Sequence, residues 1–225
     1  EWVSKTEHTE KALWDAVKVA DLGALSDMLK RGPGALLWAQ RGGTKATFMH
    51  EIINNDLLAG TVLFHNSVPP LFGAPLGMLK DASGRTALHL AAYKLRVDHL
   101  RYLFPLPWLD CKATDKLGRT PLHTFLRRLR GVRISNSRGD DTSGDVDRVG
   151  GAMSSATNEL QTRACNEVVR LAIERDPDIG ALRDTDGFSV LDYAMSLGDI
   201  TIATALVAAI RPHLDWKTLL RQALF

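Results

Sequence analysis

The sequence predicts an all-α fold built from a repeated helical unit, and a recurring phrase is the main observation behind this prediction. Residues 81–89 read DASGRTALH, and the phrase returns at residues 115–123 as DKLGRTPLH. A weaker copy, DTDGFSVLD, occupies residues 184–192. Apolar residues at helical spacing follow each copy. A fixed period of roughly this length is typical of proteins in which one supersecondary unit is stacked several times.

The phrase Thr-Pro-Leu-His at 120–123 resembles the signature of the ankyrin-repeat family. The resemblance implies an ankyrin-repeat solenoid of about five repeats, each with a β-turn finger and two helices, and a closing C-terminal helix. The chain is then a single domain, 1–225. The expected units are repeats at about 11–41, 42–80, 81–114, 115–183 and 184–211, and a capping helix at 213–225.

Two departures from the family pattern are expected to alter the stack. The fourth repeat runs from Asp115 to the next phrase at Asp184, which is about twice the usual length. Its first helix is expected at 121–129. The stretch near 130–157 is rich in Gly, Ser, Asp and Arg, so we expect a mobile insertion there. Leu95 stands where the family prefers glycine between helices, so we expect a distorted turn.

The balanced charge of the chain excludes few classes of partner, whereas its two cysteines favour an intracellular location. The chain carries 28 basic and 26 acidic residues, a formal charge of +2, and this balance does not by itself indicate a nucleic-acid or membrane partner. No apolar run reaches about 18 residues, so no membrane insertion is expected. Cys111 and Cys165 form neither a C-x-x-C pair nor a disulfide framework, which favours an intracellular location, cytoplasmic or nuclear. Residues 1–3 lack methionine and the features of a signal peptide, so we expect a piece of a longer protein.

The histidines of the repeated phrase are the residues most easily mistaken for a metal site. His50, His89 and His123 stand one per repeat, and this separation is far from the ligand spacing of one helix or loop. The resemblance implies instead that each one hydrogen-bonds backbone beside the threonine of its phrase. No phosphate-binding, nucleophile or zinc-hydrolase motif occurs in the sequence. We therefore expect no cofactor, no metal and no catalytic activity.

The candidate binding residues follow from where the family places its concave groove, along the fingers and the ends of the first helices. In that register Lys94, Arg127 and Arg128 lie on the groove, and three further basic residues lie on the fingers beside it. Tyr93 is one candidate apolar anchor, because aromatic residues and arginine are enriched at binding hot spots. The full candidate set is Arg85, Tyr93, Lys94, Lys116, Leu117, Arg119, Arg127, Arg128, Asp186 and Phe188.

These residues predict a non-catalytic protein–protein interaction module that binds a partner segment, preferably an acidic one, on its concave groove. Arginine favours this reading because its planar fork pairs bidentately with carboxylates. We expect the isolated chain to be monomeric. A nucleic-acid-binding module using the same basic groups is an alternative, although few exposed aromatic residues are interleaved for base stacking. A second alternative is a regulatory domain of a larger enzyme. The basic cluster is also compatible with an ordinary solvent-exposed surface that binds no partner.

Overall fold

The computed structural model describes residues 11–31, 40–67, 77–138 and 155–210, and these are mostly helical, as the all-α prediction requires. Residues 11–18 are helical, and a pair of two-residue strands joins Gln40 to Thr47 and Arg41 to Ala46. The strands are β1 (Gln40–Arg41) and β2 (Ala46–Thr47). The helices are α2 (Leu22–Arg31), α4 (Phe48–Asn54), α5 (Leu58–Ser67), α7 (Ala87–Tyr93), α8 (Val97–Leu103), α9 (Pro121–Arg138), α10 (Ser155–Arg175), the 3-10 helix η1 (Pro177–Ala181), α11 (Val190–Ser196) and α12 (Ile200–Ile210).

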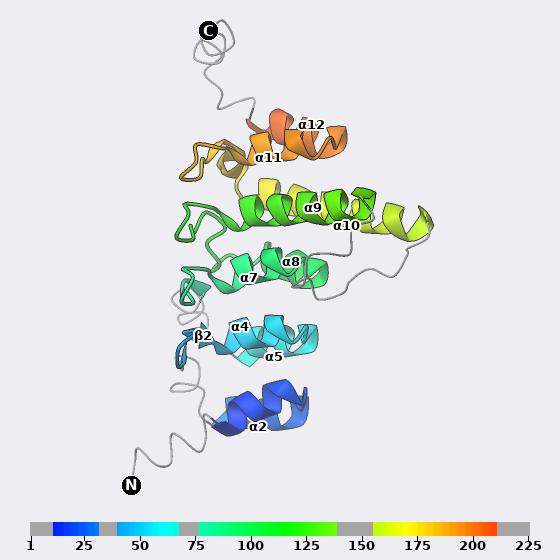
Figure 1. Ribbon diagram of the computed structural model, residues 1–225. Helices are drawn as coiled ribbons and strands as arrows, with labels where there is room; N and C mark the ends of the chain where they lie inside the picture. The colour runs from blue at the N-terminus through cyan, green and yellow to red at the C-terminus, as the bar shows by residue number, and fades with distance from the viewer. Residues whose placement is uncertain (1–10, 32–39, 68–76, 139–154, 211–225) are drawn as a thin grey trace, which may run out of the picture.

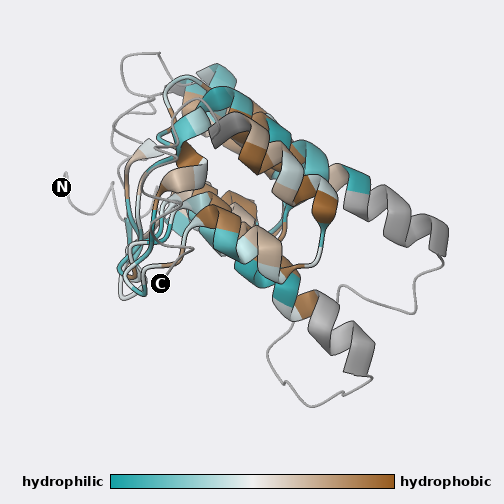
Figure 2. Ribbon diagram, turned by 90° about the horizontal axis from the view of Figure 1, so that it is seen from above, coloured by the Kyte–Doolittle hydropathy of each residue, from teal (hydrophilic) through white to brown (hydrophobic). Residues whose placement is uncertain are grey.

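The helices lie in two rows along the molecule. One row is a chain of contacts from α4 to α7, from α7 to α9 and from α9 to α11, and the other runs from α5 through α8 and α10 to α12. Figure 1 shows the resulting layers stacked in sequence order, with the turns that precede the first row gathered on one side. Viewed along the stack in Figure 2, the two rows lie next to each other. Helices far apart in sequence, such as α7 and α9, are therefore neighbours in space.

Large apolar side chains fill the space within and between the layers. The phenylalanines Phe48, Phe64, Phe104 and Phe125 are at most 1% exposed and belong to one continuous core cluster of the described residues. Small residues such as Ala91 of α7 are fully buried as well. Close approach of α7 to α4 and α9 depends on them, because a short side chain lets two helix backbones come near each other.

The turns between paired helices share one backbone conformation. Ala20, Asp56, Leu95 and Gly198 have φ of 56°, 56°, 55° and 68°, all in the left-handed region. The turn at Leu95 is therefore regular, and the expectation of a distorted turn is wrong. Leu95 packs against the core, and this contact offsets the cost of about 1 kcal/mol that a side chain brings to the left-handed region.

The expected insertion is shorter than the sequence suggested. We expected a mobile stretch near 130–157, but α9 continues to Arg138 and α10 already begins at Ser155. The loop prediction is wrong at 130–138 and 155–157. Extending an existing helix adds one hydrogen bond for each residue fixed, without a new nucleus, so α9 continues through 130–138 although this stretch contains Gly, Ser and Asn. Residues 139–154 and the expected capping helix at 213–225 lie outside the described residues.

Candidate functional site

Each recurring phrase begins with a turn that its own aspartate organises. Asp81 Oδ1 accepts hydrogen bonds from the backbone N–H groups of Ser83 and Arg85, both at 2.8 Å, and its Oδ2 accepts from Arg85 Nε at 2.9 Å. Asp115 binds its turn and Arg119 in the same way. Burial alone would raise the pKa of both carboxyl groups, but the hydrogen bonds from the turn and the arginine outweigh it and lower the pKa. Both aspartates are therefore ionised.

The turns at 41–46, 81–85, 115–119 and 184–188 touch one another in succession, and together they form one continuous surface, which we call the turn-lined face. The backbone N–H of Ala82 donates to Thr44 O at 2.8 Å, and that of Thr185 donates to Leu117 O at 3.1 Å. A methyl group placed on Gly84, whose φ is 77°, would lie 3.0 Å from the backbone nitrogen of Lys116 in the next turn. The close approach therefore depends on glycine at this position.

Gly84→Ala is expected to lower the free energy of unfolding by about 2 kcal/mol, because it adds a backbone clash to the cost of a left-handed φ. Gly43→Ala is the matched control. Its φ is 78°, but a methyl group there meets nothing within 4 Å, so about half the loss is expected. Urea unfolding measures both, and equal losses would show that contact between the turns adds no stability.

Buried histidines tie each layer to the next. The carbonyl of Arg85 can only accept, so His50 Nε2–H donates to it at 2.9 Å, and His50 Nδ1 then accepts from Thr47 Oγ1 at 2.7 Å. His89 repeats this arrangement with Thr86 at 2.8 Å and the carbonyl of Arg119 at 2.8 Å. Desolvation lowers the pKa of both imidazoles, that of His89 to about 4, so they are neutral. The expected structural role is confirmed for both.

His123 departs from this pattern because the last phrase is weaker. It keeps the contact to Thr120 Oγ1 at 2.8 Å, and its Nε2 lies near the carbonyls of Leu182 and Phe188 without reaching hydrogen-bond geometry within the described chain. Its ring instead meets the ring of Tyr193 at right angles, with centroids 5.8 Å apart.

Two guanidinium groups of the candidate set lie over the ring of Tyr93. The Cζ atom of Arg85 is 5.3 Å from the ring centroid and that of Arg128 is 5.1 Å from it, which are cation–π distances. Tyr93 remains 39% exposed. These three residues come from a turn, from the end of α7 and from α9. The structure therefore joins three of the predicted residues into one cluster, which we call the Tyr93 cluster.

Two further candidates present apolar surface on the neighbouring turns. Leu117 is 47% exposed and Phe188 is 53% exposed. The ring of Phe188 meets that of Tyr193 edge to face, with centroids 6.0 Å apart. Asp186 is exposed on the same turn as Phe188. The turn-lined face thus carries apolar groups on successive turns.

Tyr193 is a site residue that the sequence reasoning missed. Its hydroxyl donates to Asp184 Oδ2 at 2.8 Å, where the other turns have an arginine. The pKa of Tyr193 is raised, because the effects of burial and of Asp184 outweigh the opposing charges of Arg127 and Arg119. One signal could have revealed it. The third phrase has Phe188 in place of arginine, so Asp184 needed another donor.

Fewer basic groups are available for a partner on this face than the six that the sequence analysis placed there. Arg85 forms an ion pair with Asp81 at 2.8 Å, and Arg119 forms one with Asp115 at 2.7 Å, so both charges are compensated within their own turns. Lys94 is half-buried at the end of α7. Lys116 and Arg127 are exposed, and Arg128 is half-buried against Tyr93. Among the described residues, the positive charge that no carboxylate pairs with is therefore centred on α9 and on the turn before it.

The groups of this face are suited to binding. They are cationic hydrogen-bond donors, aromatic rings and aliphatic surface. Within the described ranges, no group of three or more His, Cys, Asp or Glu side chains is placed to hold a metal ion. Of the helices that the structure describes, none has the length and apolar character needed to cross a membrane. No family model matches this chain.

Proposed function

We propose that this chain is an ankyrin-repeat solenoid that acts as a non-catalytic protein–protein interaction module. The regular step between the two strong phrases, at 81–89 and 115–123, supports the family. So do the threonine–histidine pairs at the start of α4, α7 and α9, and the chain of contacts through α4, α7, α9 and α11. In such a stack each unit contacts only its neighbours, and the function is carried by an extended surface.

The binding surface in this proposal is the turn-lined face, and the Tyr93 cluster is the observation that carries it. Tyrosine and arginine are the residue types that dominate binding energy at interfaces. The hydrogen bonds between turns hold the face in one arrangement before binding, so little conformational entropy is lost when a partner docks. Tyr93 is exposed enough to be covered by a partner side chain.

The partner is an acidic segment of another protein. Asp81 and Asp115 already neutralise two of the arginines, which leaves Arg127, Arg128 and Lys116 as the groups that a carboxylate can reach. A guanidinium fork pairs with a carboxylate through two parallel hydrogen bonds. Acidic side chains of the partner then lie over α9, and its apolar side chains lie over Leu117 and Phe188.

The binding takes place inside the cell, in the cytoplasm or nucleus, with the isolated chain a monomer. Cys111 and Cys165 are both buried and neither is in a disulfide, which fits a reducing compartment. A nucleic acid is the less favoured ligand for the same face, because Tyr93 and Phe188 are the two exposed large rings in the described part of the chain, which is few for the stacking of successive bases.

Reversing two charges tests the proposal. Arg127→Glu/Arg128→Glu is expected to weaken partner binding by at least about thirtyfold, because hot-spot substitutions cost about 2 kcal/mol or more. The wild type and the double variant are each used to capture partners from cell lysate, and the captured proteins are identified by mass spectrometry. The affinity of each for the purified partner is then measured. Arg163→Glu/Arg170→Glu is the matched control, since both residues are exposed on α10 in the other row of helices and the change in net charge is the same.

Three outcomes are distinguished. Loss in Arg127→Glu/Arg128→Glu alone supports protein docking on the turn-lined face. Equal binding by the double variant and the wild type would place the interface elsewhere. Recovery that disappears when both arms are treated with nuclease would instead identify a nucleic-acid ligand, with affinity that falls steeply as salt rises.

A further inference from the structure

The positive charge around the Tyr93 cluster exceeds what one carboxylate can neutralise. Asp81 holds Arg85 through Nε at 2.9 Å and Nη2 at 2.8 Å, and its single charge compensates that arginine. Arg127 and Arg128 form no ion pair within the described part of the chain. Among the described residues, two adjacent positive charges of α9 are therefore left without a counter-charge on the turn-lined face.

The ring of Tyr93 brings two guanidinium groups to the same part of the surface. The Cζ atoms of Arg85 and Arg128 lie 5.3 Å and 5.1 Å from one ring centroid. A guanidinium stacked on a ring still directs its N–H groups outward in its own plane, where they can donate hydrogen bonds. Among the described residues, no acceptor occupies Nη1 of Arg85 or the nitrogens of Arg128. The cluster therefore presents cationic donors that are already positioned beside an aromatic ring.

We propose that the Tyr93 cluster receives a phosphorylated serine or threonine of the partner segment, an inference that rests on the proposed function. A phosphomonoester carries a charge of about −1.5 to −2 at neutral pH and three strong acceptor oxygens. It matches the two uncompensated charges of α9, and its oxygens can accept from both arginines of the cluster. A carboxylate brings a single charge and two oxygens. Tyr93 is exposed, so a short side chain reaches the cluster.

The charges farther along the turn-lined face favour the Tyr93 cluster as the place for the phosphate. On the last turn Asp186 is exposed, and Arg183 is already paired with Asp192 at 3.7 Å. A dianion is repelled by the carboxylate of Asp186. The phosphorylated residue of the partner therefore lies over the Tyr93 cluster, and its apolar residues lie over the last two turns.

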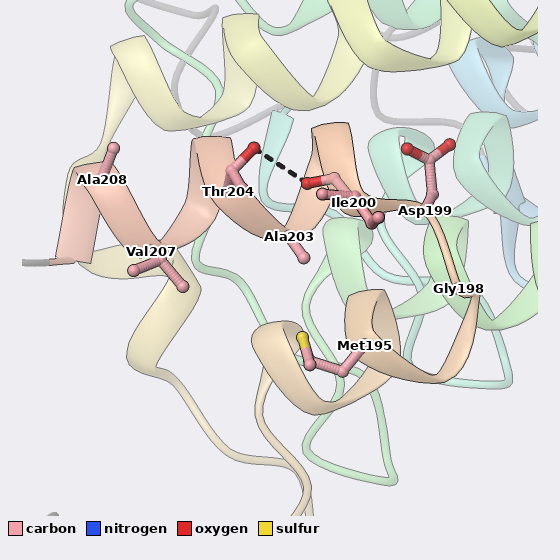
Figure 3. A pocket seen from close by; sticks show the side chains of 8 residues that line it. All are labelled: Met195, Gly198, Asp199, Ile200, Ala203, Thr204, Val207 and Ala208. Carbon is pink, nitrogen blue, oxygen red and sulfur yellow. Dashed lines mark hydrogen bonds between the residues drawn. The ribbon is translucent and has the colours of Figure 1, made fainter.

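The apolar groove between α11 and α12 is not suited to the same ligand. It has a volume of about 480 Å³ and is lined mainly by apolar side chains such as Met195. Figure 3 shows that the hydroxyl of Thr204 in this lining already donates to the carbonyl of Ile200, at 2.8 Å. Asp199 also lines the groove and repels an anion. Of these two surfaces, only the turn-lined face offers a phosphate cationic donors.

Titrations of the full chain with small probes test this inference. N-acetyl-phosphoserine N-methylamide supplies a phosphomonoester, and N-acetyl-aspartate N-methylamide supplies a carboxylate on the same backbone. Diethyl phosphate supplies the singly charged diester of a nucleic-acid backbone. Binding is followed by nuclear magnetic resonance of the arginine side-chain N–H groups. The phosphoserine probe is expected to shift the signals of Arg85 and Arg128 and to bind at least about tenfold more tightly than the other two.

Four variants locate the site of binding. Arg128→Gln is expected to weaken binding of the phosphoserine probe at least about tenfold, because a charge-assisted hydrogen bond is lost. Arg130→Gln is the matched control, since Arg130 is exposed on the same helix but does not lie over Tyr93, and a change of at most about twofold is expected. Tyr93→Leu removes the ring without changing the charge and should weaken binding about threefold, whereas Tyr93→Phe restores a ring and should recover most of it. Unchanged backbone amide spectra show that each variant stays folded.

A preference for the phosphoserine probe that is lost in Arg128→Gln and kept in Arg130→Gln supports the inference. Equal affinity for the phosphoserine and aspartate probes would overturn it, and so would a preference that Arg128→Gln leaves unchanged. Equal affinity for diethyl phosphate would also overturn it, in favour of a nucleic-acid backbone.

Phosphatase treatment of a purified partner separates this inference from the proposed function. A partner that depends on Arg127 and Arg128 but binds equally well after phosphatase treatment would support the proposed function and overturn the inference. Affinity that falls at least about tenfold after treatment supports both.

Discussion

His89→Leu is expected to lower the free energy of unfolding by about 3 kcal/mol. Leucine has a similar volume, so the loss comes from polar groups rather than from a cavity. The substitution leaves the carbonyl of Arg119 and the hydroxyl of Thr86 without their buried partner, and His89 itself is fully buried. An unsatisfied buried polar group costs about 1–3 kcal/mol. Urea unfolding followed by circular dichroism measures the effect.

His123→Leu is the comparison that isolates the bond between layers. His123 contacts Thr120 as His89 contacts Thr86, but its Nε2 makes no hydrogen bond within the described chain. We therefore expect about half the loss, on the order of 1–2 kcal/mol. If both substitutions cost the same, the hydrogen bond from the histidine to the next turn would add nothing to stability.

Mild acid is expected to unfold the stack through its buried histidines. Desolvation lowers the pKa of His50, His89, His99 and His123 in the folded chain, while the unfolded value is about 6.5. The unfolded state therefore binds more protons below pH 6.5. The stabilisation is complete above this pH and is lost as the pH falls through the folded values. For His89, whose pKa is about 4, the loss amounts to about 3 kcal/mol.

The measurement is the midpoint of urea unfolding at pH values from 7.5 to 4.5. The midpoint should fall steadily below pH 6.5, and His89→Leu should have a smaller slope than the wild type although it is less stable. The carboxyl groups of Asp81, Asp115 and Asp184 have lowered pKa values, so their stabilisation is lost only below their usual value of 3.8. A midpoint that stays constant from pH 7 to pH 5 would contradict the assignment to histidine.

Much of the fold was predictable because its determinants are local. The capping pairs of Thr47 with His50 and of Thr86 with His89 join residues close in sequence, and the aspartate-led turns are equally short. Interactions of such short range leave a repeated pattern in the sequence. The end of α9 was missed for a related reason, because composition describes the tendency of a stretch to be ordered but not the low cost of extending a helix that already exists.

The candidate site was predictable only as a set of residues. Arg85 pairs with Asp81, four residues away, and this pair reduces the positive charge that the sequence predicted for the binding surface. The Tyr93 cluster, by contrast, depends on which side chains of α7, α9 and the turns meet across layers.

The sequence by itself determined the mostly helical fold, the aspartate-led turns of the recurring phrase and the structural role of His50 and His89. Only the tertiary structure decided that Arg128 lies over Tyr93, that Tyr193 replaces an arginine at Asp184, and that an apolar groove lies between α11 and α12. The physical reason is distance along the chain. Contacts between residues in different layers depend on how the helices of those layers pack, and this packing depends on side-chain shapes that no local pattern records.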